Sequence, residues 1–219
     1  MTPAAFRGKN IPMDRKDALG SLETIRAILE RSTRLTHIAP GGILASGMAA
    51  VGASIIGALL GIDPRRPAAF LVLWALVLAF ALGAGVGLSA RMARRRGELF
   101  WGRKLRFVAS GVLPSAVGAI LVTAALIDAG RLDLGPGTWM VSYGIAILSI
   151  GMVLDWEYRA AGWAFLVAGS LALFLFRGSP HLSMGITFGG IHAALGAFRF
   201  AMEGVEECHV PLPSAELIS

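Results

Sequence analysis

The stretch "AAFLVLWALVLAFALGAGVGLSA", residues 68–90, holds 23 consecutive residues without a charge. The hydrocarbon core of a bilayer is about 30 Å thick, and a helix needs about 20 apolar residues to cross it. Buried core helices of soluble proteins usually have apolar runs of about 10 to 14 residues. The length of this stretch therefore predicts a membrane-spanning helix.

Five further uncharged runs lie on either side of it. Two are long, 25 residues at 38–62 and 21 residues at 107–127. Three have only 17 uncharged residues, at 138–154, 160–176 and 182–198. Each short run by itself could be a re-entrant or interfacial segment. Together the six runs predict an all-α fold, a polytopic transmembrane helical bundle over residues 38–199 whose six spans form three hairpins.

The charge distribution predicts how the bundle is oriented. Lysine and arginine concentrate in short cytoplasmic loops. With both termini in the cytoplasm, 16 of the 20 basic residues lie inside, and those outside are Arg65, Arg66, Arg131 and Arg177. This predicts a multi-pass membrane protein with both termini in the cytoplasm. The net charge of +6 could also serve nucleic-acid binding, but no recognition motif accompanies it, so no direct binding to nucleic acid is expected.

The most basic segment is "RMARRRGELFWGRKLRF", residues 91–107, between the second and third spans. Its seven cations are Arg91, Arg94, Arg95, Arg96, Arg103, Lys104 and Arg106. A basic residue close to a membrane surface gains about 1 kcal/mol from anionic lipid. We therefore expect this segment to contact anionic lipid at the cytoplasmic face.

The two ends of the chain are expected to lie outside the membrane. Residues 1–20 contain Pro and Gly without a periodic pattern and are predicted to be disordered. Residues 21–36 place leucine and isoleucine at helical spacing after a capping Ser21, which predicts a cytoplasmic amphipathic helix. Residues 200–219 are predicted to be a flexible tail. Cys208 and His209 in this tail fall short of the four ligands of a closed zinc site, and the sequence predicts neither a metal nor a cofactor.

The last span contains the polar residue of greatest interest, in "TFGGIHAALGAF" at 187–198. Gly185, Gly189, His192 and Gly196 are spaced 4, 3 and 4 residues apart, so an α-helix places them on one face. Small residues mark the surfaces where membrane helices meet. His192 is therefore expected to point at a neighbouring helix, about 3 Å beyond the midpoint of its span.

Two roles remain open for His192. An ionisable group at that depth is a functional candidate, which could bind a ligand, a proton or a metal ion. Neutral imidazole can also be a packed structural group when both nitrogens have partners. The fourth span offers Ser142, Tyr143 and Ser149 as partners. His181, in contrast, falls at an interface and looks incidental.

A second candidate group lies at the cytoplasmic mouth of the fourth and fifth spans. Asp155, Glu157 and Arg159 could bind a cation or close a gate there, or form a solvated cap. No Walker loop, HExxH, nucleophile elbow or haem-attachment motif occurs in the chain. We therefore do not expect an enzyme.

Several stretches carry a resemblance to known proteins. They are "IRAILERSTR" before the first span, "WGRKLRF" at 101–107, "LPSAVG" at 113–118, "SYGIAIL" at 142–148 and "FGGIHAALG" at 188–196. Over about residues 22 to 200 the chain resembles an uncharacterised bacterial family of small six-span membrane proteins. In that family a tyrosine usually stands where this chain has Leu195. Members are often encoded beside a small DNA-binding regulator, which implies a signalling or regulatory role.

The sequence thus predicts a non-enzymatic sensor or regulatory membrane protein. The alternative is a small transporter or channel subunit with His192 on its pathway. Candidate partners are the lipid bilayer, a cytoplasmic regulatory protein and a second copy of the chain.

Overall fold

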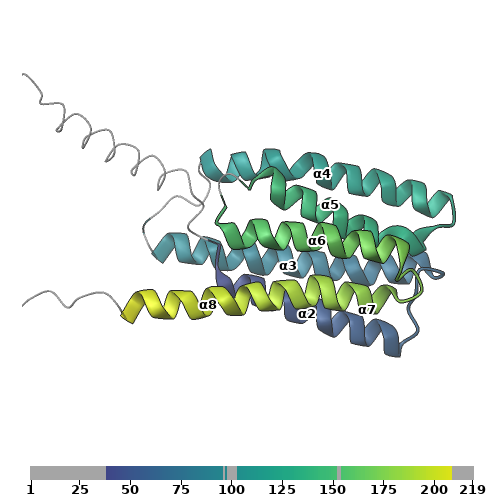
Figure 1. The fold of residues 1–219 in the computed structure, drawn as a ribbon, viewed down its shortest axis with the longest axis horizontal. Helices are drawn as coiled ribbons and strands as arrows, with labels where there is room; N and C mark the ends of the chain where they lie inside the picture. The colour runs from purple at the N-terminus through teal and green to yellow at the C-terminus, as the bar shows by residue number, and fades with distance from the viewer. Residues whose placement is uncertain (1–37, 96, 98–102, 152–153, 209–219) are drawn as a thin grey trace, which may run out of the picture. The chain divides into compact units, whose positions relative to one another are not determined.

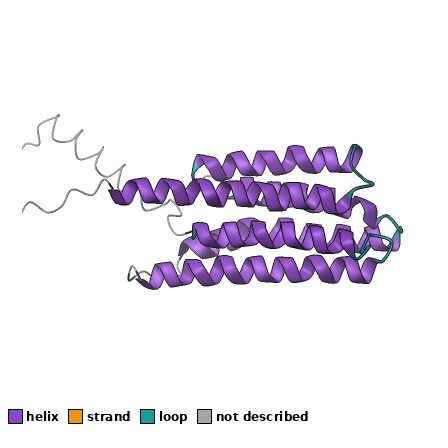
Figure 2. Cartoon of the chain, turned by 90° about the horizontal axis from the view of Figure 1, so that it is seen from below, coloured by secondary structure: helices purple, strands orange, loops and turns teal. Residues whose placement is uncertain are grey.

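The computed structural model describes residues 38–95, 97, 103–151 and 154–208. Within them every regular element is helical, as predicted, and all belong to the compact unit Leu35–Ser219. Figure 1 shows the helices packed as a bundle, and Figure 2 shows them lying along a common direction with the loops at their ends. The predicted disordered segment 1–20, the amphipathic helix 21–36 and residues 209–219 lie outside the described residues.

The helices follow one another as the apolar runs predict. The first three are α2 (Pro40–Leu59), α3 (Pro67–Arg95) and α4 (Arg103–Asp128). A short 3₁₀ turn, η1 (Leu132–Leu134), leads into α5 (Gly135–Ser149), and α6 (Trp156–Phe174) follows. The last element is continuous through three segments, α7 (Pro180–Met184), the π-helical η2 (Gly185–Ile191) and α8 (His192–Cys208).

Three helices are long and apolar enough to cross a membrane, namely Pro40–Leu59, Pro67–Arg95 and Leu105–Asp128. Most apolar side chains of α3 and α4 lie outside the core, although Phe70 and Trp74 of α3 belong to it. In the most apolar 18-residue window of α4 none of the residues is buried, and in that of α3 only 11% are. Apolar surface on this scale is unfavourable in water and is typical of helices that contact lipid.

The other predicted spans differ from the structure in their bounds. α5 has 15 residues, about 22 Å of helix at 1.5 Å per residue, which is less than a bilayer core. It starts three residues before the predicted Thr138 because Pro136 stands in its first turn, where a missing N–H costs nothing. The final helix runs on to Cys208, so the predicted flexible tail begins as helix. The described residues therefore support three of the six predicted spans.

The helices pack in two groups rather than in three successive hairpins. α2 packs against α3, α7, η2 and α8, while α5 packs against α4 and α6. The predicted third hairpin, α6 with the last helix, is therefore wrong as a primary pairing, because α6 packs mainly on α5 and α8 mainly on α2. We call the two sets the α2 group and the α5 group.

Glycines allow backbones to touch inside each group. A Cβ added at Gly47 of α2 would lie 2.5 Å from the amide nitrogen of Ala193 and 2.8 Å from the carbonyl oxygen of Gly189. A Cβ at Gly144 of α5 would lie 2.8 Å from the carbonyl oxygen of Gly162 on α6. Such close approach is how helices associate in lipid, where no hydrophobic force draws them together.

Candidate functional site

Four aromatic rings meet where the α2 group contacts the α5 group. They belong to Tyr143 of α5, Phe165 of α6, Phe188 of η2 and His192 of α8, and we call them the His192 cluster. Ring centroids are 4.8 Å apart for Tyr143 and Phe165, and 5.0 Å apart for Phe165 and Phe188. Phe188 stacks on His192 at 6.2 Å with an interplanar angle of 13°. The cluster therefore joins both groups around one imidazole.

Both nitrogens of His192 have partners. Nδ1 lies 2.7 Å from the carbonyl oxygen of Phe188, and Nε2 lies 2.9 Å from the hydroxyl of Tyr143. A carbonyl can only accept, so Nδ1 must carry a hydrogen. In the neutral ring Nε2 is then an acceptor, and the Tyr143 hydroxyl donates to it. The contacts thus select one tautomer of a neutral histidine.

The π-helical turn explains where His192 points. The backbone N–H of His192 donates to Gly189, while its side chain donates to Phe188. The sequence pattern placed His192 on one face with Gly185, Gly189 and Gly196. In the structure those glycines lie against α2, where Ala193 joins them, and His192 turns toward α5. The difference arises because a π turn contains more residues than an α turn and rotates the next part of the helix.

Tyr143 is the predicted partner that the structure brings to His192. Ser142 instead accepts at its backbone carbonyl from the hydroxyl of Ser115, at 2.6 Å, which ties α5 to α4. The Ser149 hydroxyl is exposed and donates to Ile145 in its own helix, at 2.8 Å. Both serines thus have hydrogen bonds that join or stiffen the α5 group.

The charged residues at the start of α6 form a cluster with an arginine that was not selected from the sequence. Nη1 of Arg199 on α8 lies 2.6 Å from Glu157 Oε1 and 3.4 Å from Asp155 Oδ2. Its guanidinium also lies 5.7 Å from the ring centroid of Tyr158. We call these four residues the Arg199 cluster.

The structure does not place Arg159 on the same side of α6 as Glu157. Glu157 is buried and Arg159 is exposed, because residues two apart on an α-helix point to nearly opposite sides. A usable signal was present in the sequence: Arg199 follows His192 by seven residues, about two helical turns, and so lies on the same side of α8.

Arg199 remains charged in this setting. Burial opposes the charge, but nearby Tyr158, the hydrogen bond to Glu157 and the charges of Glu157 and Asp155 outweigh it and raise the pKa of Arg199. The Glu157 side chain is only 8% exposed. A carboxylate so buried needs a paired cation, and Arg199 supplies it.

A second histidine is buried at the other end of the bundle. His181 looked incidental in the sequence, yet it is 8% exposed and its Nε2 hydrogen-bonds the carbonyl of Ile62. Its ring stacks on Trp74 at 6.3 Å, and Phe70 beside it stacks on Trp139 of α5 at 5.9 Å. Gly57 of α2 makes room for this ring, because an added Cβ there would collide with the imidazole.

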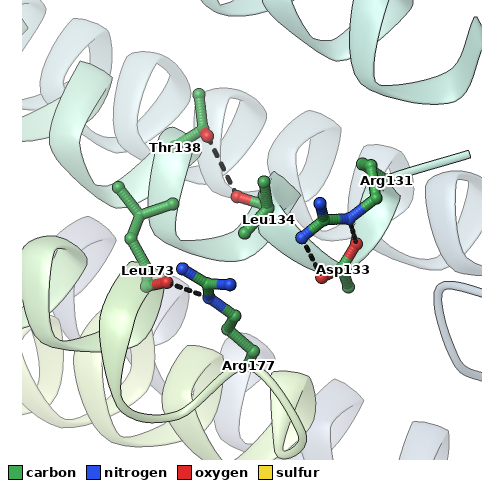
Figure 3. A network of polar contacts seen from close by, with 6 residues as sticks. All are labelled: Arg131, Asp133, Leu134, Thr138, Leu173 and Arg177. Atoms are coloured by element: carbon green, nitrogen blue, oxygen red, sulfur yellow. Dashed lines mark hydrogen bonds and ion pairs between the residues drawn. The ribbon is translucent and has the colours of Figure 1, made fainter. Parts of the chain in front are cut away.

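Side chains near η1 form hydrogen bonds and an ion pair at the ends of the helices (Figure 3). Arg131 and Asp133 form an ion pair at 3.0 Å, and the Thr138 hydroxyl donates to the carbonyl of Leu134 at 2.9 Å. Arg177 Nε donates to the carbonyl of Leu173, which satisfies an otherwise unpaired acceptor in the last turn of α6.

The Arg131–Asp133 pair predicts a small acid dependence of stability. The hydrogen bond from Arg131 is the main cause that lowers the pKa of Asp133. A lowered folded-state pKa stabilises the fold above the unfolded value of about 3.9, and this contribution is lost as the pH falls through the folded value. From about pH 5 downward, the free energy of unfolding should therefore fall more steeply in the wild-type protein than in Asp133→Asn. An equal acid response in both proteins would contradict it.

The basic segment 91–106 is partly described. Arg91, Arg94 and Arg95 are exposed at the end of α3, and Arg106 is exposed near the start of α4. The side chains of Arg96, Arg103 and Lys104 lie outside the described part, as do those of Cys208 and His209. Among the described residues no three histidine, cysteine or acidic side chains are close enough to hold a metal ion.

The chain matches no family model, no curated protein and no solved structure. The resemblance to small six-span bacterial proteins therefore stays an expectation from the sequence. Function must be argued from the His192 cluster and the Arg199 cluster themselves.

Proposed function

We propose that the protein is an integral protein of a bacterial inner membrane, with six spans and both termini in the cytoplasm. The exposed apolar faces of α2, α3 and α4 support a membrane location. The orientation is supported by Arg91, Arg94, Arg95 and Arg106, which gather where α3 ends and α4 begins. Anionic lipid at the cytoplasmic surface would attract these side chains.

Reporter fusions test this topology. A reporter active in the cytoplasm, fused after Gly97, should be active, and one fused after Asp63 should be inactive. The reverse pattern would overturn the proposed orientation.

Within that membrane protein we propose a non-enzymatic sensor or regulatory function. The observation that carries the proposal is the 2.9 Å hydrogen bond from Tyr143 to His192, because it joins the α5 group to the α2 group. Any agent that separates the α5 group from the α2 group must break this hydrogen bond. A proton, an apolar ligand or a change in the lipid could act in this way. Since α8 runs from His192 to Cys208, movement at His192 would be transmitted along that helix to a cytoplasmic regulatory protein.

Purification in a mild detergent tests the regulatory function. Wild-type protein should retain a specific cytoplasmic protein, and Tyr143→Phe should change the amount retained. Ser149→Ala is the matched control, because it removes an exposed hydroxyl from the same helix. Absence of any specific protein, or equal retention by all three, would count against a sensor.

One observation favours the alternative, a small transporter or channel subunit. The last helix departs from α geometry over Gly185–Ile191, directly before His192, and many transporters bind substrates at interrupted helices near the membrane midplane. Transport requires residues 185–199 to be reachable by water from both sides. Single cysteines introduced there into a Cys208→Ser protein should then react with polar thiol reagents added to either side. If only protected positions are found, the transport hypothesis fails.

A further inference from the structure

Two contacts fix the register of α8 against α6. Phe165 meets His192 with ring centroids 5.4 Å apart, and Glu157 meets Arg199 at 2.6 Å. The contacts are separated by eight residues on α6 and by seven on α8, about two turns in each helix. Because the contacts lie on two antiparallel helices at matching intervals, sliding or turning α8 cannot change one of them alone.

The Arg199 cluster is only partly satisfied. The contact with Glu157 is short, as expected for a charge-assisted hydrogen bond of about 2.7–2.9 Å, whereas the contact with Asp155 is longer, at 3.4 Å. The Nε atom of Arg199 is buried and has no acceptor among the described residues. Glu157 is therefore the nearest charged partner of Arg199, with Asp155 and Tyr158 as weaker contacts.

The last helix is irregular at η2, which packs on α2 through Gly185 and Gly189. π-Helices are rare and occur mostly as single-turn interruptions of α-helices, frequently at functional sites. η2 contains Gly185, Gly189 and Gly190, and an added Cβ at Gly190 would meet nothing within 4 Å. A shift between π and α geometry would rotate α8 relative to α7, which would carry His192 away from Tyr143.

We propose that the Arg199 cluster is a latch that holds His192 against Tyr143. When Arg199 binds Glu157, α8 stays in the register in which Nε2 of His192 accepts from the Tyr143 hydroxyl. Release of Arg199 at the cytoplasmic end lets α8 turn at η2 and breaks that hydrogen bond. The inference adds a regulatory contact to the proposed sensor and rests on it for its biological meaning, but the coupling itself can be measured without any signalling partner.

The test is the tautomer of His192, read by nitrogen NMR of detergent-solubilised protein labelled with ¹⁵N-histidine. The His192 signals are assigned by their loss in His192→Leu. Wild-type protein should show the Nδ1–H form alone. Glu157→Gln should instead show a mixture of the Nδ1–H and Nε2–H forms. Asp133→Asn, which removes a carboxylate from the other described ion pair, should look like wild type.

The outcomes separate the latch from the site. Unchanged His192 signals in folded Glu157→Gln would overturn the latch and leave the His192 cluster standing. A different tautomer in the wild-type protein would overturn the cluster and with it the observation behind the sensor. If Glu157→Gln does not fold, Arg199→Lys is tested instead, because it keeps the charge but loses the planar group over Tyr158. This variant should show partial loss of the Nδ1–H form. The wild-type tautomer alone would overturn the latch.

Discussion

Replacing Gly47 with alanine is expected to destabilise the protein by about 1–3 kcal/mol, the usual cost of overpacking. The new Cβ would fall 2.5 Å from the amide nitrogen of Ala193 and 2.8 Å from the carbonyl oxygen of Gly189. Both are backbone atoms, which cannot move aside as the end of a flexible side chain can. α2 would have to separate from η2 and α8, and the close backbone packing between them would be lost.

Gly52→Ala is the matched control because Gly52 lies on the same helix and an added Cβ there meets nothing within 4 Å. Alanine is the better helix former by about 1 kcal/mol, so this variant should be neutral or more stable. Thermal unfolding in one detergent compares the two. Equal unfolding midpoints for the two variants would show that α2 and α8 do not touch as described. A lower midpoint for Gly52→Ala than for Gly47→Ala would contradict the prediction outright.

The second large effect concerns the hydrogen bond between Tyr143 and His192. Tyr143→Phe keeps the ring in the His192 cluster and leaves Nε2 of His192 without a donor, and His192→Leu leaves the Tyr143 hydroxyl without an acceptor. An unpaired buried polar group costs about 1–3 kcal/mol. Each single variant should therefore lower the free energy of unfolding by about this amount.

The double variant is the sharper measurement. Once both polar groups are gone, neither side of the Tyr143–His192 hydrogen bond is left unpaired, and replacing both partners by apolar groups can be nearly neutral. Tyr143→Phe/His192→Leu should lose clearly less stability than the sum of the single losses, with a coupling of about 0.5–3 kcal/mol. Additive losses would mean that the two side chains do not interact. Ser149→Ala, an exposed hydroxyl on α5, should change stability by less than about 0.5 kcal/mol.

Interpreting the candidate site from sequence worked where local spacing suffices. Tyr143 is one of three partners that the fourth span offered to His192, and the structure brings it there, although the helical spacing had put His192 on the glycine face. Arg159 lies close to Glu157 along the chain but on another side of α6, because the helical repeat decides which side chains share a face. His181 looked incidental because its neighbours Phe70 and Trp74 lie more than a hundred residues away in sequence.

The uninterrupted runs of uncharged residues were enough to predict that the chain is helical and that three of its helices are long and apolar enough to cross a membrane, because such runs permit few other structures. It also placed the basic residues where α3 ends and α4 begins. Three features became visible only in the folded chain: α8 packs on α2, a π turn rotates His192 toward Tyr143, and Arg199 binds Glu157. Periodicity describes one helix at a time, whereas these contacts depend on where glycines let two backbones approach and on which distant charge can satisfy a buried carboxylate.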